Sequence, residues 1–171
     1  MGEVTILGVD PGFGVTGFSV VKTDQGKSFL LDCGYLKMSS SKHLSERTGI
    51  FYAFMQEKII CHGVNQVALE TSFLGKNAQV FLKLGYLRGI LYLLADQHKL
   101  ALHEFAPREV KTAVTGFGGA SKEQVAMMML TMFPKLNEFG SIEKADVTDA
   151  LAVALCGLWT ARQQKLMKRL S

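Results

Sequence analysis

The sequence predicts a single α/β domain built on a five-stranded mixed sheet, with strands one to three antiparallel, strands four and five parallel, and helices flanking the sheet. Three observations lead to this prediction. A chain of 171 residues is long enough for one well-cored domain but short for two. Runs rich in β-forming residues and joined by tight turns fill its first third. Helical patterns then alternate with further strand patterns.

The first three strands are expected to form an antiparallel meander. Each is a run rich in β-branched and aromatic residues, and the segment from Asp24 to Lys27 has the composition of a hairpin turn between the second and the third. We expect these strands at residues 4–9, 17–23 and 29–36.

A helix is expected to connect the meander to the fourth strand. Apolar residues recur at helical spacing over residues 43–62, and Gly63 is a natural stop signal. The fourth strand, at residues 64–69, follows directly. Because a crossover helix normally makes the next strand parallel to its neighbour, this strand should run parallel to the first.

The second half of the chain is expected to alternate helices with one further strand. We place helices at residues 78–98, 108–114 and 121–132 and the fifth strand at 101–105. Pro107 suits a first helical turn, and Ser121 begins a capping box after a glycine-rich loop at 115–120. Gly85 and Gly89 each cost their helix about 1 kcal/mol relative to alanine. Something must therefore pack closely against them, either the sheet, which is the favoured interpretation, or a second subunit.

The composition indicates a soluble protein, which we expect to be cytoplasmic. No apolar run reaches the roughly 18 uncharged residues of a membrane-spanning helix, and the N-terminus lacks the basic region of a signal peptide. Cys33, Cys61 and Cys156 lie far apart without metal-ligand spacing. We therefore expect reduced core thiols, with neither a zinc site nor a disulfide.

The basic residues are unevenly distributed along the chain. Residues 160–171 carry four of them and no acid, so the net charge of +4 leaves residues 1–159 neutral overall. We therefore divide the chain into a domain at 1–159 and a basic C-terminal tail at 160–171. Within the domain, residues 74–122 hold seven basic and three acidic residues. This local excess is where a polyanionic partner would bind.

Four carboxylates are the candidate catalytic and metal-binding residues: Asp10, Glu70, Asp146 and Asp149. Asp10 and Glu70 each close an apolar strand, and two neighbouring parallel strands would bring both acids to one edge of the sheet. Asp146 and Asp149 are three residues apart in a segment whose apolar spacing suits a helix, so they share a face. An all-oxygen site of this kind suits Mg²⁺ or Mn²⁺. Two such ions would support in-line phosphoryl displacement.

With these residues in view, the chain resembles the RuvC family of Holliday-junction resolvases, which have the RNase H-like fold. The resemblance covers about residues 4–156. It is carried by four motifs in order: Ile6-Leu-Gly-Val-Asp-Pro-Gly12 with Thr16-Gly17; Glu70 followed by Phe73 and Lys76; Leu82-Lys-Leu-Gly-Tyr-Leu-Arg-Gly89 with Lys111, Gly116-Phe-Gly118 and Lys122; and Ala145-Asp-Val-Thr-Asp-Ala-Leu-Ala-Val-Ala154.

The resemblance implies a homodimer that resolves four-way DNA junctions by symmetric paired incisions, with two Mg²⁺ ions per subunit and Mn²⁺ able to substitute. It also implies a branch-migration partner of the RuvA–RuvB type. The four carboxylates match the family's metal-binding acids. The helix of Gly85 and Gly89 matches its dimer helix, which shifts the favoured interpretation of these glycines toward a subunit interface. The residues that match its DNA-contacting positions are Phe73, Lys76, Lys111 and Lys122.

Parts of the sequence are also compatible with three other functions. Gly12-Phe-Gly14-Val-Thr-Gly17 matches a dinucleotide-binding fingerprint, but that fingerprint must open a helix and β-forming residues follow it here, so we reject it. The same segment is similar to the first phosphate loop of actin-like ATPases and sugar kinases. Those proteins need a second such domain, which leaves ATP binding as the alternative enzyme class. A catalytically inactive junction-binding module is the remaining alternative.

Overall fold

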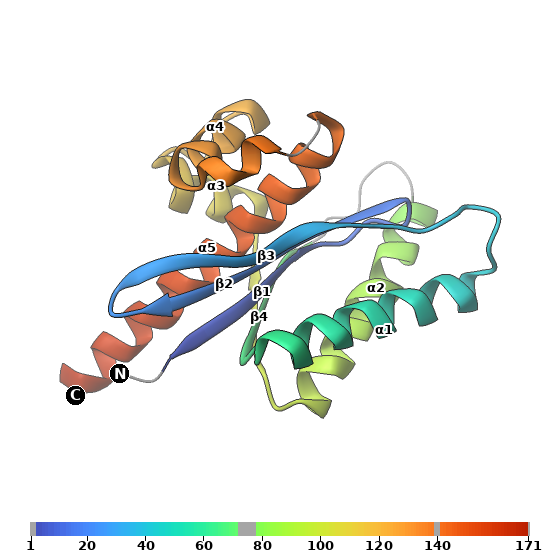
Figure 1. Ribbon diagram of the computed structural model, residues 1–171, viewed down its shortest axis with the longest axis horizontal. Coiled ribbons are helices and arrows are strands. Elements are labelled where there is room, and N and C mark those ends of the chain that lie inside the picture. Colours follow the sequence, from blue (N-terminus) through green and yellow to red (C-terminus); the bar gives the residue numbers. More distant parts are fainter. Residues whose placement is uncertain (1–2, 72–77, 139–140, 171) are drawn as a thin grey trace.

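The computed structural model describes residues 3–71, 78–138 and 141–170. Its five strands form one sheet in the order β3-β2-β1-β4-β5 (Figure 1). The strands are β1 (Val4–Asp10), β2 (Val15–Asp24), β3 (Lys27–Lys37), β4 (Gln66–Glu70) and β5 (Ala101–Phe105). The helices are α1 (Leu44–His62), α2 (Ala78–Gln97), α3 (Pro107–Thr115), α4 (Lys122–Met132), the short 3-10 helix η1 (Pro134–Glu138) and α5 (Ser141–Leu170).

Strand directions confirm the predicted mixed sheet. β1 and β2 are antiparallel, as are β2 and β3, whereas β4 is parallel to β1 and β5 is parallel to β4. The hairpin between β2 and β3 turns at Gln25 and Gly26, which both have positive φ. Since β2 begins at Val15, a strand follows the glycine-rich segment, as the rejection of the dinucleotide fingerprint requires.

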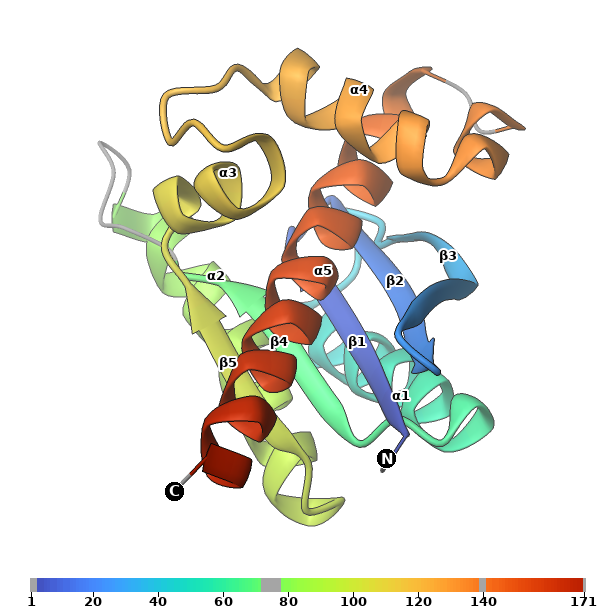
Figure 2. The ribbon, with the colours of Figure 1, turned by 90° about the vertical axis from the view of Figure 1, so that its left-hand side faces the viewer.

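Two helical layers cover the sheet. Helices α1 and α2 lie on one face and α5 crosses the other, while α3 and α4 lie beyond the ends of β1 and β5 (Figures 1 and 2). Alternate residues of β1 serve the two layers. Ile6 belongs to the apolar cluster that includes α5, and Leu7 to the cluster that includes α1 and α2.

Helix α5 lies unusually close to the sheet. A Cβ atom added to Gly8 would lie 2.3 Å from the carbonyl oxygen of Ala150, and one added to Gly17 would lie 2.1 Å from the carbonyl oxygen of Asp146. Ser19 also donates a hydrogen bond to the Ala150 carbonyl, at 3.2 Å. Because no side chain larger than hydrogen fits at these two glycines, they fix the start of α5 against β1 and β2. The same helix continues through the basic residues after position 160.

Two interpretations drawn from local sequence patterns alone are wrong. A Cβ added to Gly85 or Gly89 would meet no atom within 4 Å, so these glycines do not pack against the sheet. They are instead open on the outer side of α2.

The second correction concerns the cysteines. All three cysteines are free, as predicted, but Cys61 is exposed and Cys33 is only half-buried, so Cys156 alone is a core thiol. Cys61 lies on the exposed side of α1, and the apolar residues around it in the sequence did not predict this exposure.

By length and composition alone, α2 would qualify as a membrane-crossing helix, with a mean hydropathy of 1.3. The sequence was expected to contain no membrane-spanning segment, because Lys83 and Arg88 interrupt this apolar run. These two charges nevertheless leave the mean hydropathy of the helix high enough for a membrane-crossing helix. In the structure, Leu87, Leu91 and Leu94 are fully buried in the cluster beneath the sheet. Only 22% of the apolar window is buried, however, and Val80, Leu82 and Leu93 are among its exposed residues.

Candidate active site

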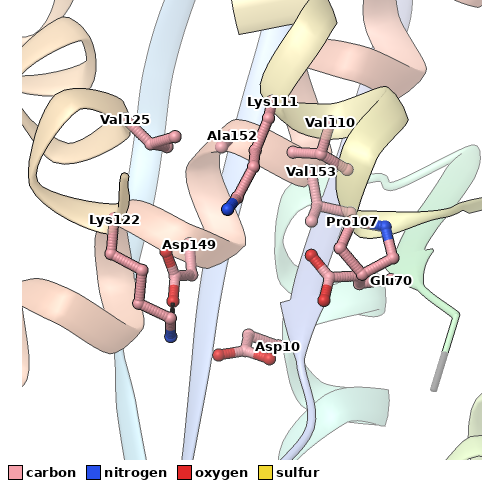
Figure 3. Close-up of a pocket in the computed structure, with 10 residues that line it drawn as sticks. All are labelled: Asp10, Glu70, Pro107, Val110, Lys111, Lys122, Val125, Asp149, Ala152 and Val153. Atoms are coloured by element: carbon pink, nitrogen blue, oxygen red, sulfur yellow. Dashed lines mark hydrogen bonds and ion pairs between the residues drawn. The ribbon is translucent and has the colours of Figure 1, made fainter. Parts of the chain in front are cut away.

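Asp10 and Glu70 meet at one edge of the sheet because their strands are parallel neighbours. Val9 lies opposite Leu69 in the register of β1 and β4, so the next residue of each strand emerges at the same edge. Figure 3 shows the two carboxylates on either side of a shared cavity. The crossover rule applied to the sequence predicts this juxtaposition.

Asp149 reaches the same cavity from α5. The close packing of α5 on Gly8 and Gly17 sets the distance between this helix and the sheet. Asp149 points from α5 toward Asp10 (Figure 3). Asp146 lies about one turn earlier, with its backbone against Gly17, and does not line the cavity. Its charge nevertheless acts on Asp10, whose pKa it helps to raise.

Two lysines face the acids from the helices above the sheet. Lys111 comes from α3 and Lys122 from the first turn of α4, and both line the cavity. Lys122 donates a hydrogen bond from Nζ to Oδ2 of Asp149 at 2.9 Å. This bond raises the pKa of Lys122 above its ordinary value, so the lysine stays charged. The two helices thus place cations opposite the carboxylates.

The carboxylates repel one another, and burial together with this repulsion raises the pKa values of Asp10 and Glu70. Burial, followed by the charges of Asp149 and Glu70, raises the pKa of Asp10 to about 7. Burial and Asp149 also raise the pKa of Glu70, against the opposing effect of Lys122 and Lys111. Neighbouring carboxylates ionise reluctantly unless a cation relieves their repulsion. The donor set is made of oxygens alone, which fits a hard divalent cation.

The cavity itself is small. It encloses about 190 Å³, below the roughly 300–1,000 Å³ typical of small-molecule pockets. Such a volume suits ions and one phosphate group better than a whole nucleotide. Among the residues that the structure describes, no three His, Cys, Asp or Glu side chains are close enough together to hold an ion as they stand.

An apolar wall behind the acids was missed in the sequence. It consists of Pro107, Val110, Val125, Ala152 and Val153. The last two follow Asp149 by three and four positions, so helical spacing could have placed them on its face. An apolar wall excludes water and strengthens electrostatic interactions inside the cavity.

A second unpredicted feature supports the loop that follows Asp10. Arg47 of α1 donates a hydrogen bond to the backbone carbonyl of Phe13, and its guanidinium lies 4.7 Å from the centre of the Phe13 ring. Met38 N also donates to the carbonyl of Gly14, at 3.0 Å. These contacts hold the turn between β1 and β2 from outside the cavity.

The structure therefore brings five of the predicted site residues together around one cavity: Asp10, Glu70, Lys111, Lys122 and Asp149. Asp146 is adjacent but outside the cavity lining. Phe73 and Lys76, the other two predicted DNA contacts, lie outside the described residues.

Comparison with known proteins identifies the chain's relatives. A family model described as "Crossover junction endodeoxyribonuclease RuvC" matches residues 6–157. A protein of that name from Chlorobium phaeobacteroides is 50% identical over 155 residues, covering 91% of this chain and 81% of the relative. Another, from Oleidesulfovibrio alaskensis, is 35% identical over 163 residues and covers 95% of both chains. The structure of T. thermophilus RuvC in complex with Holliday junction substrate superposes with a TM-score of 0.84 at 28% identity, covering 94% of this chain and 96% of that one.

The sheet order and the acids at its edge define the class: an RNase H-like nuclease domain. Within that class, the chain belongs to the RuvC family of crossover junction endodeoxyribonucleases.

Proposed function

We propose that this chain resolves four-way DNA junctions by hydrolysing one phosphodiester bond in each of two opposed strands. The observation that carries the proposal is the cluster of Asp10, Glu70 and Asp149 at one sheet edge, faced by Lys111 and Lys122. Acids that suit divalent cations, next to cations that suit phosphates, are the two parts that phosphodiester hydrolysis requires. The T. thermophilus relative in complex with a Holliday junction supports the choice of substrate.

Metal-dependent cleavage is typical of this family. We infer that Asp10, Glu70, Asp146 and Asp149 hold two Mg²⁺ ions per subunit, for which Mn²⁺ can substitute. When bound, the ions lower the pKa of a water molecule and stabilise the leaving oxygen. The raised pKa values of Asp10 and Glu70 support this assignment, because a site of mutually repelling carboxylates gains most from a bound cation.

Lys111 and Lys122 are the proposed phosphate contacts of the cleaved strand. Each projects from a helix that ends or begins at the loop between α3 and α4, so both approach the cavity from the side opposite the sheet. Lys122 would exchange its bond to Asp149 for one to a phosphate oxygen. Phe73 and Lys76 are proposed as further DNA contacts on the strength of the family motif.

Paired incision requires two sites, and we propose that they come from a homodimer joined through α1 and α2. A broad groove runs between these helices on the face away from the cavity, and Tyr52, Tyr86, Ile90 and Leu93 are among its lining residues. Gly85 and Gly89 also line it, and each leaves room for a close approach. Exposed apolar side chains on both sides of two glycines suit a second copy of the chain better than water.

The setting of the reaction follows from the family. We propose that the enzyme acts in the cytoplasm, with a RuvA–RuvB-type branch-migration complex as its partner. Residues 160–171 remain our proposed basic tail, which would add nonspecific affinity for DNA. ATP binding and an inactive junction-binding module are not favoured, because the cavity is small and carries the acids of a nuclease.

One experiment tests the proposal. The purified chain is incubated with an end-labelled mobile four-way junction, a linear duplex and a nicked duplex, each with Mg²⁺ or with EDTA. We expect symmetric, Mg²⁺-dependent incisions in the junction and little cutting of either duplex. Equal cutting of all three DNAs, or cutting in EDTA, would refute the proposal.

A further inference from the structure

We propose that Phe117 stacks on a nucleobase of the cleaved strand close to the scissile phosphate. This inference rests on the proposed function and adds a DNA contact that the sequence motifs do not assign. Phe117 lies in the loop between α3 and α4, and one lysine from each helix, Lys111 of α3 and Lys122 of α4, lines the cavity. A strand held by both lysines would therefore pass along this loop.

The exposure of Phe117 is the first observation. The residue is 66% exposed, the highest value among the exposed aromatic residues that the structure describes. A single exposed apolar side chain is common on protein surfaces and proves little by itself. The construction of the loop around it carries the argument further.

The loop holds the backbone of Phe117 in one conformation. Its N–H donates to Oγ1 of Thr115 at 3.1 Å, and its carbonyl accepts a hydrogen bond from the N–H of Ala120 at 3.1 Å. Gly116 adopts a φ of +78°, in the left-handed region that favours glycine. The ring is thus presented by a fixed turn rather than by a loosely held segment.

The next two glycines make room for this presentation. A Cβ at Gly118 would lie 2.6 Å from Cγ of Arg108 and 2.8 Å from Oγ1 of Thr112, so the loop folds tightly onto α3. A Cβ at Gly119 would lie 2.6 Å from Cζ of Phe117, so the ring rests on the backbone of that glycine. With one side of the ring supported and most of the residue exposed, a flat apolar surface is preorganised for a partner.

The basic residues of the two neighbouring helices favour nucleic acid as that partner. Arg108, Lys111 and Lys122 lie on the two helices that the loop connects. An aromatic ring set among cations is the usual platform for a base of a single or locally opened strand, because the ring takes the base and the cations take the phosphates. The groove proposed for a second copy of the chain lies between α1 and α2, on a different part of the molecule (Figure 1).

Fluorescence of 2-aminopurine tests the contact directly. The base analogue is placed in turn at each position flanking the cut in the cleaved strand, and the junction is titrated with the full chain in EDTA. Stacking on Phe117 should change the emission at one position, and Phe117→Ala should abolish that change. The same variant should raise the KM for junction cleavage about tenfold, with a smaller effect on kcat, since a base stack typically contributes a factor of this order or more.

Three further variants separate stacking from other effects. Phe117→Trp should restore both the fluorescence change and the KM, whereas Phe117→Leu, which keeps apolar bulk without a flat ring, should restore little. Met127→Ala is the matched control, because Met127 is 67% exposed on α4 and outside the loop. We expect wild-type cleavage from it.

Several results would overturn the inference. If the wild-type chain cuts junctions and Phe117→Ala has an unchanged KM and 2-aminopurine signal, Phe117 makes no stack and only this inference fails. A loss of equal size in Met127→Ala, or full rescue by leucine, would show that general apolar surface is responsible. If the wild type neither binds nor cuts junctions, the proposed function fails and this inference fails with it.

Discussion

Lys122 donates a hydrogen bond to Asp149 across 27 residues of sequence, at 2.9 Å, in the middle of the proposed metal site. The ammonium group thus occupies a carboxylate that a divalent cation would also use. Asp149 is largely shielded from solvent while the lysine side chain is mostly exposed, so the lysine is free to swing away. Under the proposed function, the pair has two competing partners: a metal ion for the acid, and a DNA phosphate for the lysine.

Replacing Lys122 should separate metal binding from cleavage. In Lys122→Met, the carboxylates lose a competing cation that lowers the pKa of Asp10 and Glu70. Mn²⁺ should therefore bind about three- to tenfold more tightly at pH 8, as expected for removing one nearby charge in a partly shielded site. Junction cleavage should nevertheless fall, because a phosphate contact is lost. Isothermal titration with Mn²⁺ and a cleavage assay measure the two effects.

Lys135→Met is the control, since this lysine lies in η1 and outside the cavity. It should leave both measurements unchanged. A Lys122→Met variant that binds Mn²⁺ more weakly than the wild type would contradict the competition between lysine and metal.

The raised pKa of Asp10 predicts an unusual pH dependence of stability in the absence of metal. The pKa is about 7 in the folded protein and near 3.8 in the unfolded chain. Between these values the folded form holds the proton more tightly, so the free energy of unfolding decreases as pH rises. Above about pH 7, Asp10 is ionised in the folded protein and the full destabilisation by its buried charge is present. Asp10→Asn removes the charge and should raise the free energy of unfolding by about 1–3 kcal/mol at pH 8 in EDTA.

The gain should vanish near pH 4, where Asp10 is protonated in the folded wild type. Thermal or urea unfolding at the two pH values provides the measurement. Asp24→Asn, at the exposed end of β2, is a control that should show no such pH-dependent gain. Added Mg²⁺ should stabilise the wild type at pH 8 and have much less effect on Asp10→Asn. A stabilisation of Asp10→Asn that is equal at pH 4 and pH 8 would exclude charge repulsion as its cause.

The groove between α1 and α2 predicts the oligomeric state. Leu93 lines the groove and is 49% exposed, so Leu93→Glu should convert a dimer into a monomer without unfolding the chain. Light scattering coupled to size exclusion measures the mass. Leu82→Glu is matched to it, because Leu82 is on the same helix and 56% exposed but does not line the groove. A monomeric wild type would refute the dimer, and dissociation by both variants alike would place the interface elsewhere.

Local sequence patterns predicted the strands and the parallel crossover, and through them the meeting of Asp10 and Glu70. This succeeded because the position of an acid at a strand end depends only on strand direction and order. The approach of Asp149 depends on how deeply α5 settles on Gly8 and Gly17, which is a property of packing between distant segments. Helical spacing alone predicted that Asp146 and Asp149 both face the site, whereas of these two only Asp149 lines the cavity.

The errors have a similar origin. The spacing of Gly85 and Gly89 indicated close packing but carried no information about which side of α2 would be covered. The Lys122–Asp149 bond was also beyond prediction, because it joins two side chains whose helices are positioned independently. The sequence therefore predicted the helices and strands themselves, but not the contacts between the layers that they form.

The central claim is that the carboxylate cluster binds the metal ions that cut the junction. The most direct measurement compares wild type and Asp10→Asn on one end-labelled four-way junction, recording junction affinity and the rate of Mg²⁺-dependent cutting in the same samples. We predict that Asp10→Asn binds the junction with nearly wild-type affinity and that its cutting rate falls to background. Undiminished cutting by Asp10→Asn, at equal junction affinity, would contradict the account.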